Sequence, residues 1–325
     1  MTTSNFTPAQ IAGMSTSTIS TLSTDIIQGF TTAQVAALSS AQAKALTTDE
    51  MSALTTANVV GLSTAAVAAL SSAQVAALST AGWGKLGSAQ IGALSTAALG
   101  GLSAAEVGAQ IASFKAAQIA AVGTDAISGL STAQVTALST AAVAALTTAQ
   151  IAGGLTSDQV AVLGSTQVAA LSSAQAKALT TDEMSALTTA NVVGLSTAAV
   201  AALSSAQVAA LSSADILGLT KSQLLALTPQ TMPVLTSQEI SGLGSAVLSA
   251  LSTAQFAAIT TDAIQGLTSS EMTNLTTKEI AAFTTDQINA LTTTAIGGLT
   301  TTQTAAFTNA QIAGMTDQQR TNIFA

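Results

Sequence analysis

Residues 62–78 read LSTAAVAALSSAQVAAL, which is two copies of one eight-residue unit followed by the start of a third. The three leucines of this stretch stand eight residues apart. The first two are each followed by two hydroxyl residues, and the third begins the next unit. The same spacing of apolar anchors extends outward in both directions, from Phe6 to Ile323. An internal repeat of this kind predicts an array in which each unit packs on its neighbours.

The frame of anchors shifts at two places, and we expect both shifts to be insertions. Leu102 and Phe114 are twelve residues apart, and Leu146 and Leu155 are nine apart. These distances predict four extra residues within 102–114 and one extra residue within 146–155. About forty anchors then fill residues 1–325, which we expect to form a single octapeptide-repeat solenoid.

Each unit carries the signals that start a helix. We letter the unit a to h from its apolar anchor, so that Leu70 is a, Ser71 is b and Gln74 is e. A hydroxyl residue at b with Gln or Glu at e is a capping box, and apolar residues at a and f form a hydrophobic staple across it. All 15 acidic residues lie at c, d or e, where the helix dipole favours negative charge. Every unit is therefore expected to be a short helix capped at b.

The end of each unit is rich in small residues. Position h holds 11 of the 23 glycines, and a glycine in the left-handed conformation is expected to end the helix there. Helices of this length are unstable alone, so successive units must stack on one another. We expect the a and f side chains to form two columns in the core, and small residues at g and h to let neighbouring backbones approach closely.

A β-solenoid is the alternative fold, because Thr-rich octapeptides can also coil as strands. Side chains alternate between the two faces of a strand, and positions a and f are five residues apart. They would therefore point to opposite faces, so one uniform strand cannot bury both of them. Ala, Leu and Gln also favour helices over strands. The sequence therefore favours an all-α solenoid.

Composition excludes several classes of function. The chain has no His and no Cys, which excludes disulfides, the usual zinc and haem sites, and Ser–His–Asp or Cys–His catalytic sets. Seven basic and 15 acidic residues give a net charge of −8, which disfavours nucleic acid as a partner. Polar residues interrupt every apolar run well before the roughly 20 residues that span a membrane. We expect no enzyme activity, no catalytic residues, no cofactor, no metal and no transmembrane segment.

Two pairs of adjacent carboxylates are candidates for calcium binding or acid–base chemistry. Asp49–Glu50 and Asp182–Glu183 lie in a duplicated segment, because residues 34–79 are identical to residues 167–212. Both pairs occupy positions d and e, where the helix dipole already accounts for them. They are interpreted as helix-start residues.

Trp83 is the single tryptophan, and it lies between Gly82 and Gly84. One interpretation is local packing, in which the two glycines make room for a large ring. The other is an exposed aromatic contact with a ligand or another subunit. The sequence favours packing, and Trp83 stays a possible contact residue.

The two ends of the array are as apolar as its interior. Phe6, Ile11 and Met14 lie in the first units, and Ile323 and Phe324 lie in the last one. A solenoid without capping units exposes its core at both ends. A head-to-tail contact between such ends gives an open filament when the rotation between copies does not close. These five residues are the predicted self-assembly residues, with further copies of the same chain as partners.

The octads LTTAQIA at 146–152 and LSTAQV at 130–135 resemble arrays in large repeat-rich secreted or surface proteins of bacteria. This resemblance implies cell-surface or matrix fibres such as those of biofilms, roles in adhesion, and export without an N-terminal signal. It agrees with residues 1–14, which have neither the basic start nor the apolar core of a signal peptide. An extracellular or cell-surface location is expected on these grounds.

The sequence as a whole predicts a structural protein that assembles end to end into an extracellular filament or surface fibre. The alternative is a solenoid spacer or adhesin module, which binds an unidentified surface ligand through Trp83 and the irregular regions 102–114 and 146–155.

Replacement of Leu203, an a residue, with Asp places an unpaired charge in a core column. We expect the L203D substitution to lower the free energy of unfolding by roughly 3–5 kcal/mol, because the charge loses its hydration. Denaturant unfolding followed by circular dichroism measures this change. An unchanged midpoint would show that position a lies outside the core.

Overall fold

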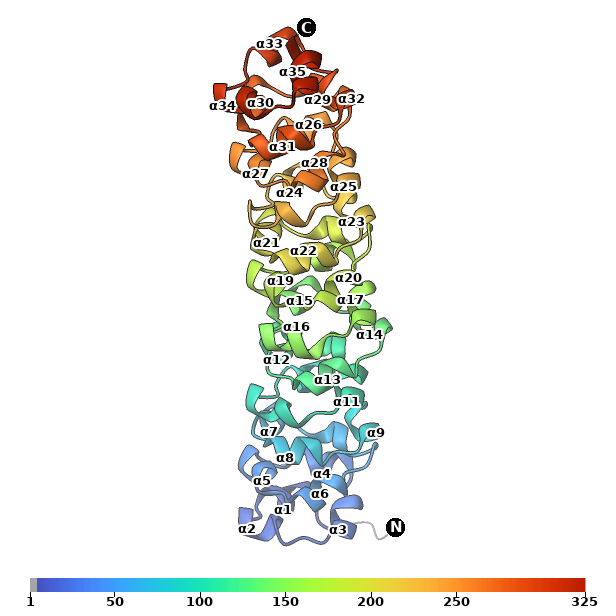
Figure 1. The fold of residues 1–325 in the computed structure, drawn as a ribbon. Helices are drawn as coiled ribbons and strands as arrows, with labels where there is room; N and C mark the ends of the chain where they lie inside the picture. Colours follow the sequence, from blue (N-terminus) through green and yellow to red (C-terminus); the bar gives the residue numbers. More distant parts are fainter. Residues whose placement is uncertain (1–4, 325) are drawn as a thin grey trace. The chain divides into compact units, whose positions relative to one another are not determined.

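The computed structural model describes residues 5–324, and all their regular elements are helices (Figure 1). No strand occurs in this range, so the all-α solenoid is confirmed and the β-solenoid is excluded. Residues 1–4 and Ala325 lie outside the described residues, so the expectation about a signal peptide at residues 1–14 falls partly outside them. The chain divides into two compact units, unit 1 (Met1–Val162) and unit 2 (Leu163–Ala325).

Unit 1 consists of α-helices of four to seven residues and three 3-10 helices, which carry the label η. Its elements are α1 (Pro8–Ala12), α2 (Thr16–Ile19), α3 (Thr24–Gln28), α4 (Thr32–Ala36), α5 (Ser40–Ala45), α6 (Thr48–Ser52), η1 (Val59–Gly61), α7 (Thr64–Ala68), α8 (Ser72–Ala76), α9 (Thr80–Trp83), α10 (Ser88–Ile91), η2 (Thr96–Gly101), α11 (Ala104–Ala109), η3 (Ile111–Ser113), α12 (Ala116–Ile119), α13 (Thr124–Ser128), α14 (Thr132–Thr136), α15 (Thr140–Ala145), α16 (Thr148–Gly154) and α17 (Ser157–Ala161).

Unit 2 repeats this pattern with helices of the same kind. Its elements are α18 (Ser165–Ala169), α19 (Ser173–Ala178), α20 (Thr181–Ser185), η4 (Val192–Gly194), α21 (Thr197–Ala202), α22 (Ser205–Ala210), α23 (Ser213–Gly218), α24 (Lys221–Leu224), η5 (Met232–Val234), α25 (Ser237–Gly242), α26 (Ser245–Leu248), α27 (Thr253–Ala257), α28 (Thr261–Ile264), α29 (Ser269–Asn274), α30 (Thr277–Ala282), α31 (Thr285–Ala290), α32 (Thr293–Ile296), α33 (Thr301–Thr304), α34 (Asn309–Gly314) and α35 (Asp317–Phe324).

The helix starts follow the predicted capping box. At α4, the Gln34 N–H donates to the Thr31 hydroxyl (3.3 Å), and the Thr31 N–H donates to Gln34 Oε1 (2.7 Å). Pro8 opens α1 at the first helical position, where its missing N–H is not needed. The 15 acidic residues all lie in first turns, as expected from the helix dipole.

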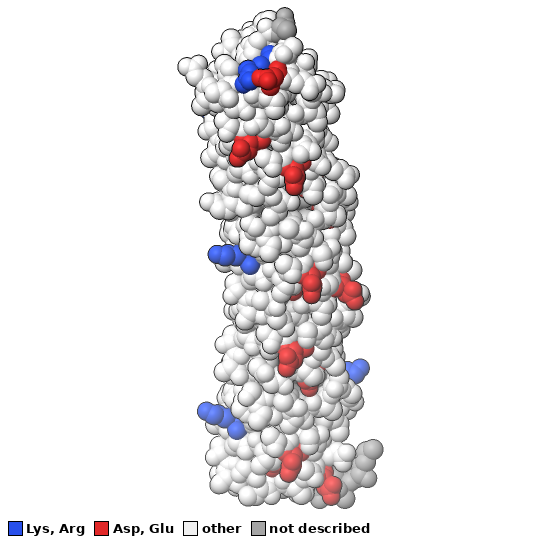
Figure 2. All heavy atoms as spheres, viewed as in Figure 1, with Lys and Arg blue, Asp and Glu red and all other residues white. Residues whose placement is uncertain are grey.

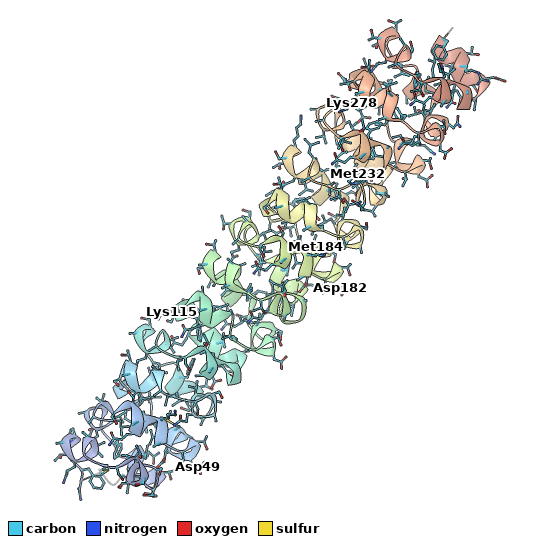
Figure 3. The ribbon with its side chains drawn as sticks, turned by 90° about the vertical axis from the view of Figure 1, so that its left-hand side faces the viewer. Asp49, Lys115, Asp182, Met184, Met232 and Lys278 are labelled. Carbon is cyan, nitrogen blue, oxygen red and sulfur yellow. The ribbon has the colours of Figure 1, made fainter. Side chains whose placement is uncertain are left out.

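The core consists of the predicted a and f columns. Leu203 at a is 5% exposed, and Val208 at f is 1% exposed. In Figure 3 the labelled Met184 and Met232, both at f, lie inside the coil, and Asp182 lies at its surface. Within each unit a helix packs against the helix three octads further along, as α5 does against α7 and α31 against α34. Each short helix is therefore stabilised by the turns above and below it.

The prediction that left-handed glycines end the helices is wrong. Gly13 and Gly29 close α1 and α3 with φ of −84° and −76°, in the right-handed region. Gly244 (φ 73°) has the only positive φ among the described residues, and it lies at b rather than h. The chain instead leaves each helix through extended residues at a and b, which any residue type can adopt.

Close packing between turns explains several of the glycines at h. A Cβ on Gly61 would lie 2.3 Å from the Thr32 carbonyl oxygen, and one on Gly266 would lie 2.0 Å from the Ser237 carbonyl oxygen. Both contacts join an h residue to the c residue 29 positions earlier, on the preceding turn. The expected close approach of backbones is therefore confirmed at these positions.

The region 102–114 is a shortened octad rather than an insertion. Gln110 Nε2 donates to the carbonyls of Trp83 (3.4 Å) and Leu86 (3.1 Å), which are f and a residues of the preceding turn. Gln110 therefore has the role of an e residue, and Ile111 is the buried f residue after it. The octad 110–113 lacks its first four positions but keeps the e and f residues that contact the preceding turn.

The second irregularity, in 146–155, is an insertion as expected. Gln159 donates to the carbonyls of Ile127 and Leu130, which lie 32 and 29 residues earlier. Regular octads give 31 and 28, so one residue has been added. The seven-residue helix α16 contains it, and the Leu155 N–H closes that helix on the Gln150 carbonyl (2.9 Å).

Replacement of Gly61 with Ala tests the close approach of turns. We expect G61A to lower the free energy of unfolding by about 1–3 kcal/mol, because the new methyl group overlaps the Thr32 carbonyl. G153A is the matched control in the same unit, since nothing lies within 4 Å of its Cβ. The denaturant midpoints of the two variants are compared. Equal midpoints would contradict this explanation of the glycines at h.

Candidate self-assembly faces

Glutamines at position e link each turn to the one before it. Gln74 is 4% exposed, and its Nε2 donates to the carbonyls of Ala43 (2.9 Å) and Leu46 (2.7 Å). Gln42 makes the same pair of bonds to Ile11 and Met14, both at 2.8 Å. In both cases the acceptors are the f and a carbonyls, 31 and 28 residues earlier. One turn of the coil therefore holds between three and four octads.

This link was missed by the sequence analysis, which assigned the e side chain only to the helix cap. Oε1 of Gln74 does accept from the Ser71 N–H (2.9 Å), as a capping box requires. The cap accepts Glu as readily as Gln. The frequent choice of Gln over Glu at position e was therefore the sequence feature that could have indicated a second role, in which the side-chain N–H₂ group donates a hydrogen bond.

The first described turn exposes its a side chains. Phe6, Met14 and Leu22 are half-buried, whereas the f residues of the same turn, Ile11 and Ile19, are 0% exposed. Of the predicted assembly residues in this turn, Phe6 and Met14 therefore reach the surface and Ile11 does not. The amide of Gln10 is also exposed, and its Oε1 already accepts from the Thr7 N–H (2.8 Å).

The last described turn exposes the opposite column. Thr304, Ile312 and Arg320 occupy position f and are half-buried, although f residues inside the units are almost fully buried. Ile323 is half-buried, and Phe324 is 49% exposed, with its ring edge-on to Phe307 at 6.5 Å. Both predicted residues of this turn are therefore at least partly accessible.

The bonds from e amides to carbonyls of the preceding turn form a hydrogen-bond ladder along the coil. On the last described turn no further e amide follows, and Arg320 supplies donors to two of the carbonyls. Its guanidinium donates to the carbonyls of Met315 (2.6 Å) and Ile312 (3.4 Å), and it also forms an ion pair with Asp317. These carbonyls are the a and f acceptors that a glutamine of a further turn would use. The corresponding carbonyls of Thr304 and Phe307 have no such donor among the described residues.

The exposed residues of the two turns are complementary. Inside the units, an a side chain packs on an f side chain of the turn before it where rings mark the contact, as Phe114 does on Trp83 and Phe283 on Phe256. The first turn presents uncovered a residues, and the last turn presents uncovered f residues and carbonyl acceptors. Stacking of the first turn of one copy on the last turn of another would repeat the contact made within each unit.

Trp83 is not part of an exposed surface. It is 0% exposed, its indole N–H donates to the Glu106 carbonyl (2.5 Å), and its ring stacks on Phe114 with centroids 6.5 Å apart. The packing interpretation of this residue therefore holds, because the ring is fully buried between turns and its N–H has a partner.

The visible surface carries few charges. Figure 2 shows isolated Asp and Glu groups separated by wide uncharged areas, with still fewer Lys and Arg. No group of three or more carboxylates among the described residues is placed to hold a metal ion. None of the described helices is both long and apolar enough to cross a membrane.

These features define a class of protein, the α-solenoid built from short repeats. A family model described as the ALTTAQ repeat matches residues 27–56, 48–80, 136–165, 155–189, 184–221, 269–301 and 280–317. The matches cover more than half of the chain, which therefore belongs to the ALTTAQ repeat family. This result confirms the type of array that the octads at 130–135 and 146–152 indicated.

Other known proteins add little to this assignment. No curated protein matches the chain. Among solved structures, the leucine-rich repeat-containing protein LegL7 from Legionella pneumophila aligns with 12% identity over 88% of each chain. Its TM-score of 0.16 is too low to support a shared fold.

Replacement of Gln74 with Ala tests the link between turns. We expect Q74A to lower the free energy of unfolding by about 1–3 kcal/mol, because it leaves the buried carbonyls of Ala43 and Leu46 without their side-chain donor. The exposed Gln28 provides the control Q28A, which should change stability by less than about 0.5 kcal/mol. Equal losses in urea unfolding of the two variants would contradict a structural role for the e amide.

Proposed function

We propose that this repeat protein is a structural scaffold that assembles head to tail into an extracellular filament or surface fibre. The observation that carries the proposal is the complementarity of the first turn, with its open a column, and the last turn, with its open f column. Such a joint is heterologous, so each added copy presents the same face again.

The hydrogen-bond ladder supports the same direction of stacking. Buried amides in each unit donate to carbonyls of the preceding turn, so a following copy must bring its first turn to the last turn of the copy before it. The exposed amide of Gln10 offers one such donor, and the carbonyls of Thr304 and Phe307 offer acceptors. Burial of these groups in a joint satisfies hydrogen bonds that otherwise go to water.

The low charge of the chain also favours association. A net charge of −8 is spread over 325 residues, of which only 7% are charged. Copies therefore repel one another weakly, and weak repulsion promotes association. The extracellular or cell-surface location rests on the resemblance of the octads to bacterial surface arrays, and with it we propose a structural rather than a catalytic role.

Single charges placed on the two faces test the joint. Met14→Glu alters the first turn and Ile312→Glu the last, and both residues are half-buried in the single chain. We expect each variant to stay folded and to raise the concentration needed for polymerisation at least about tenfold, since a 1.4 kcal/mol loss at the joint has that effect. Negative-stain microscopy and light scattering measure filament formation.

The mixture of the two variants makes the test specific for a head-to-tail joint. Each variant keeps one intact face, so the mixture should give dimers and no filaments. Val60→Glu alters an exposed residue on the side of unit 1 and should polymerise like the unaltered chain. If the unaltered protein forms only monomers at all concentrations, the polymer proposal fails, and a spacer or adhesin module becomes the better function.

A further inference from the structure

The last described turn carries three pairs of carbonyls that a further turn could use. Inside unit 2, an e amide donates to the carbonyl of an f residue and to that of the a residue three positions later, as Gln287 does to Phe256 (3.1 Å) and Ile259 (2.6 Å). The f residues of the last turn are all half-buried: Thr304, Ile312 and Arg320. Each of them begins one acceptor pair, which we name after it.

The three acceptor pairs are not equivalent. The carbonyls of the Thr304 pair, Thr304 and Phe307, have no side-chain donor within residues 5–324. Those of the Ile312 pair, Ile312 and Met315, accept from the Arg320 guanidinium at 3.4 and 2.6 Å. Arg320 therefore takes the place that an e amide of a further turn would have on the Ile312 pair.

The e residues of the first described turn also differ from one another: Gln10, Thr18 and Ile26. Gln10 is exposed and has an amide that can donate, whereas the side chain of Ile26 has no polar atom. Thr231, a threonine at e inside unit 2, bonds only to Thr228 of its own octad, so a hydroxyl group at e does not reach the preceding turn. The first turn therefore brings one amide donor, in its first octad.

We propose that the head-to-tail joint has a single register, in which Gln10 of one copy faces the Thr304 pair of the copy before it and Thr18 faces the Ile312 pair. Arg320 selects this register, because it supplies the donors that Thr18 lacks. This inference rests on the proposed function, and it specifies which residues of the two copies meet.

A rotation of the joint by one octad gives a poorer match in either direction. With Gln10 over the Ile312 pair, its amide competes with the Arg320 guanidinium, and no donor reaches the Thr304 pair. With Thr18 over the Thr304 pair, that pair again has no donor. A buried carbonyl without a donor costs free energy, so these two registers are less stable than the proposed one.

A second contact between turns reports the register directly. Inside unit 2, a Cβ on Gly218 at h would lie 3.8 Å from the Cβ of Thr189, the c residue 29 positions earlier. This separation matches the Cβ–Cβ distance of a disulfide. In the proposed register the corresponding residues are Gly13 of one copy and Asn309 of the copy before it, and both are exposed in the single chain.

Cysteine cross-linking between copies tests the register. The chain contains no cysteine, so introduced cysteines can pair only with each other. G13C protein is mixed with N309C, T301C or D317C protein, where the last two probe a shift of one octad in either direction. After oxidation of the assembled mixtures, heterodimers are measured on non-reducing gels. We expect N309C to couple to G13C at least about tenfold more than T301C or D317C does, because only that pair is adjacent in the proposed register.

The outcomes separate the register from the filament itself. Filaments in which T301C or D317C couples as well as N309C, or in which no pair couples, would overturn the register and leave the proposed function intact. Protein that stays monomeric at all concentrations and gives no heterodimer would overturn both.

Rescue between Arg320 and Thr18 provides an independent test. R320M removes the donors from the Ile312 pair and should raise the concentration needed for polymerisation about tenfold, since two carbonyls are then buried without a side-chain donor. T18Q restores a donor opposite that pair, so the double variant R320M/T18Q should polymerise like the unaltered chain. R320M/I26Q is the matched control and should stay impaired, because Ile26 faces a different pair.

Light scattering measures polymerisation of these variants, and circular dichroism verifies that each one is folded. No loss in R320M, no rescue by T18Q, or equal rescue by I26Q would each overturn the role of Arg320 in selecting the register.

Discussion

The amide of the residue at position e is the interaction on which this structure depends. A helix of four to eight residues cannot persist alone, and it leaves several backbone carbonyls without partners at its end. The glutamine at e satisfies the start of its own helix with one atom and the end of a helix in the preceding turn with another. A single side chain in each octad therefore both caps its own helix and links that helix to the preceding turn.

This arrangement explains why the coil tolerates some irregularities and excludes others. The shortened octad at 110–113 loses a cap but keeps Gln110 and Ile111, so the ladder and the core column continue through it. The added residue lengthens α16 and shifts the hydrogen-bond offsets across it by one residue. A side chain at Gly61 or Gly266, by contrast, would separate two turns, because the carbonyl below occupies the space that a Cβ needs.

Directionality is the second consequence of the ladder. Amides donate toward the preceding turn, a residues cover f residues, and no symmetry relates the two faces of a turn. Faces of this kind suit stacking in one direction, which is the basis for the proposed filament.

The sequence by itself determined the octad, the capped helix, the a and f columns and the positions of all the acidic residues, because these follow from contacts within one octad. Only the tertiary structure decided what lies between turns, since those contacts join residues 28 to 31 positions apart. The donor role of the e amide and the shortened octad at 110–113 both belong to this class. Trp83 also had two readings in the sequence, and its burial against Phe114 came from the stacking of turns. The spacing of residues along the chain shows which of them belong to the same octad. The number of residues in one turn of the coil decides which octads contact each other.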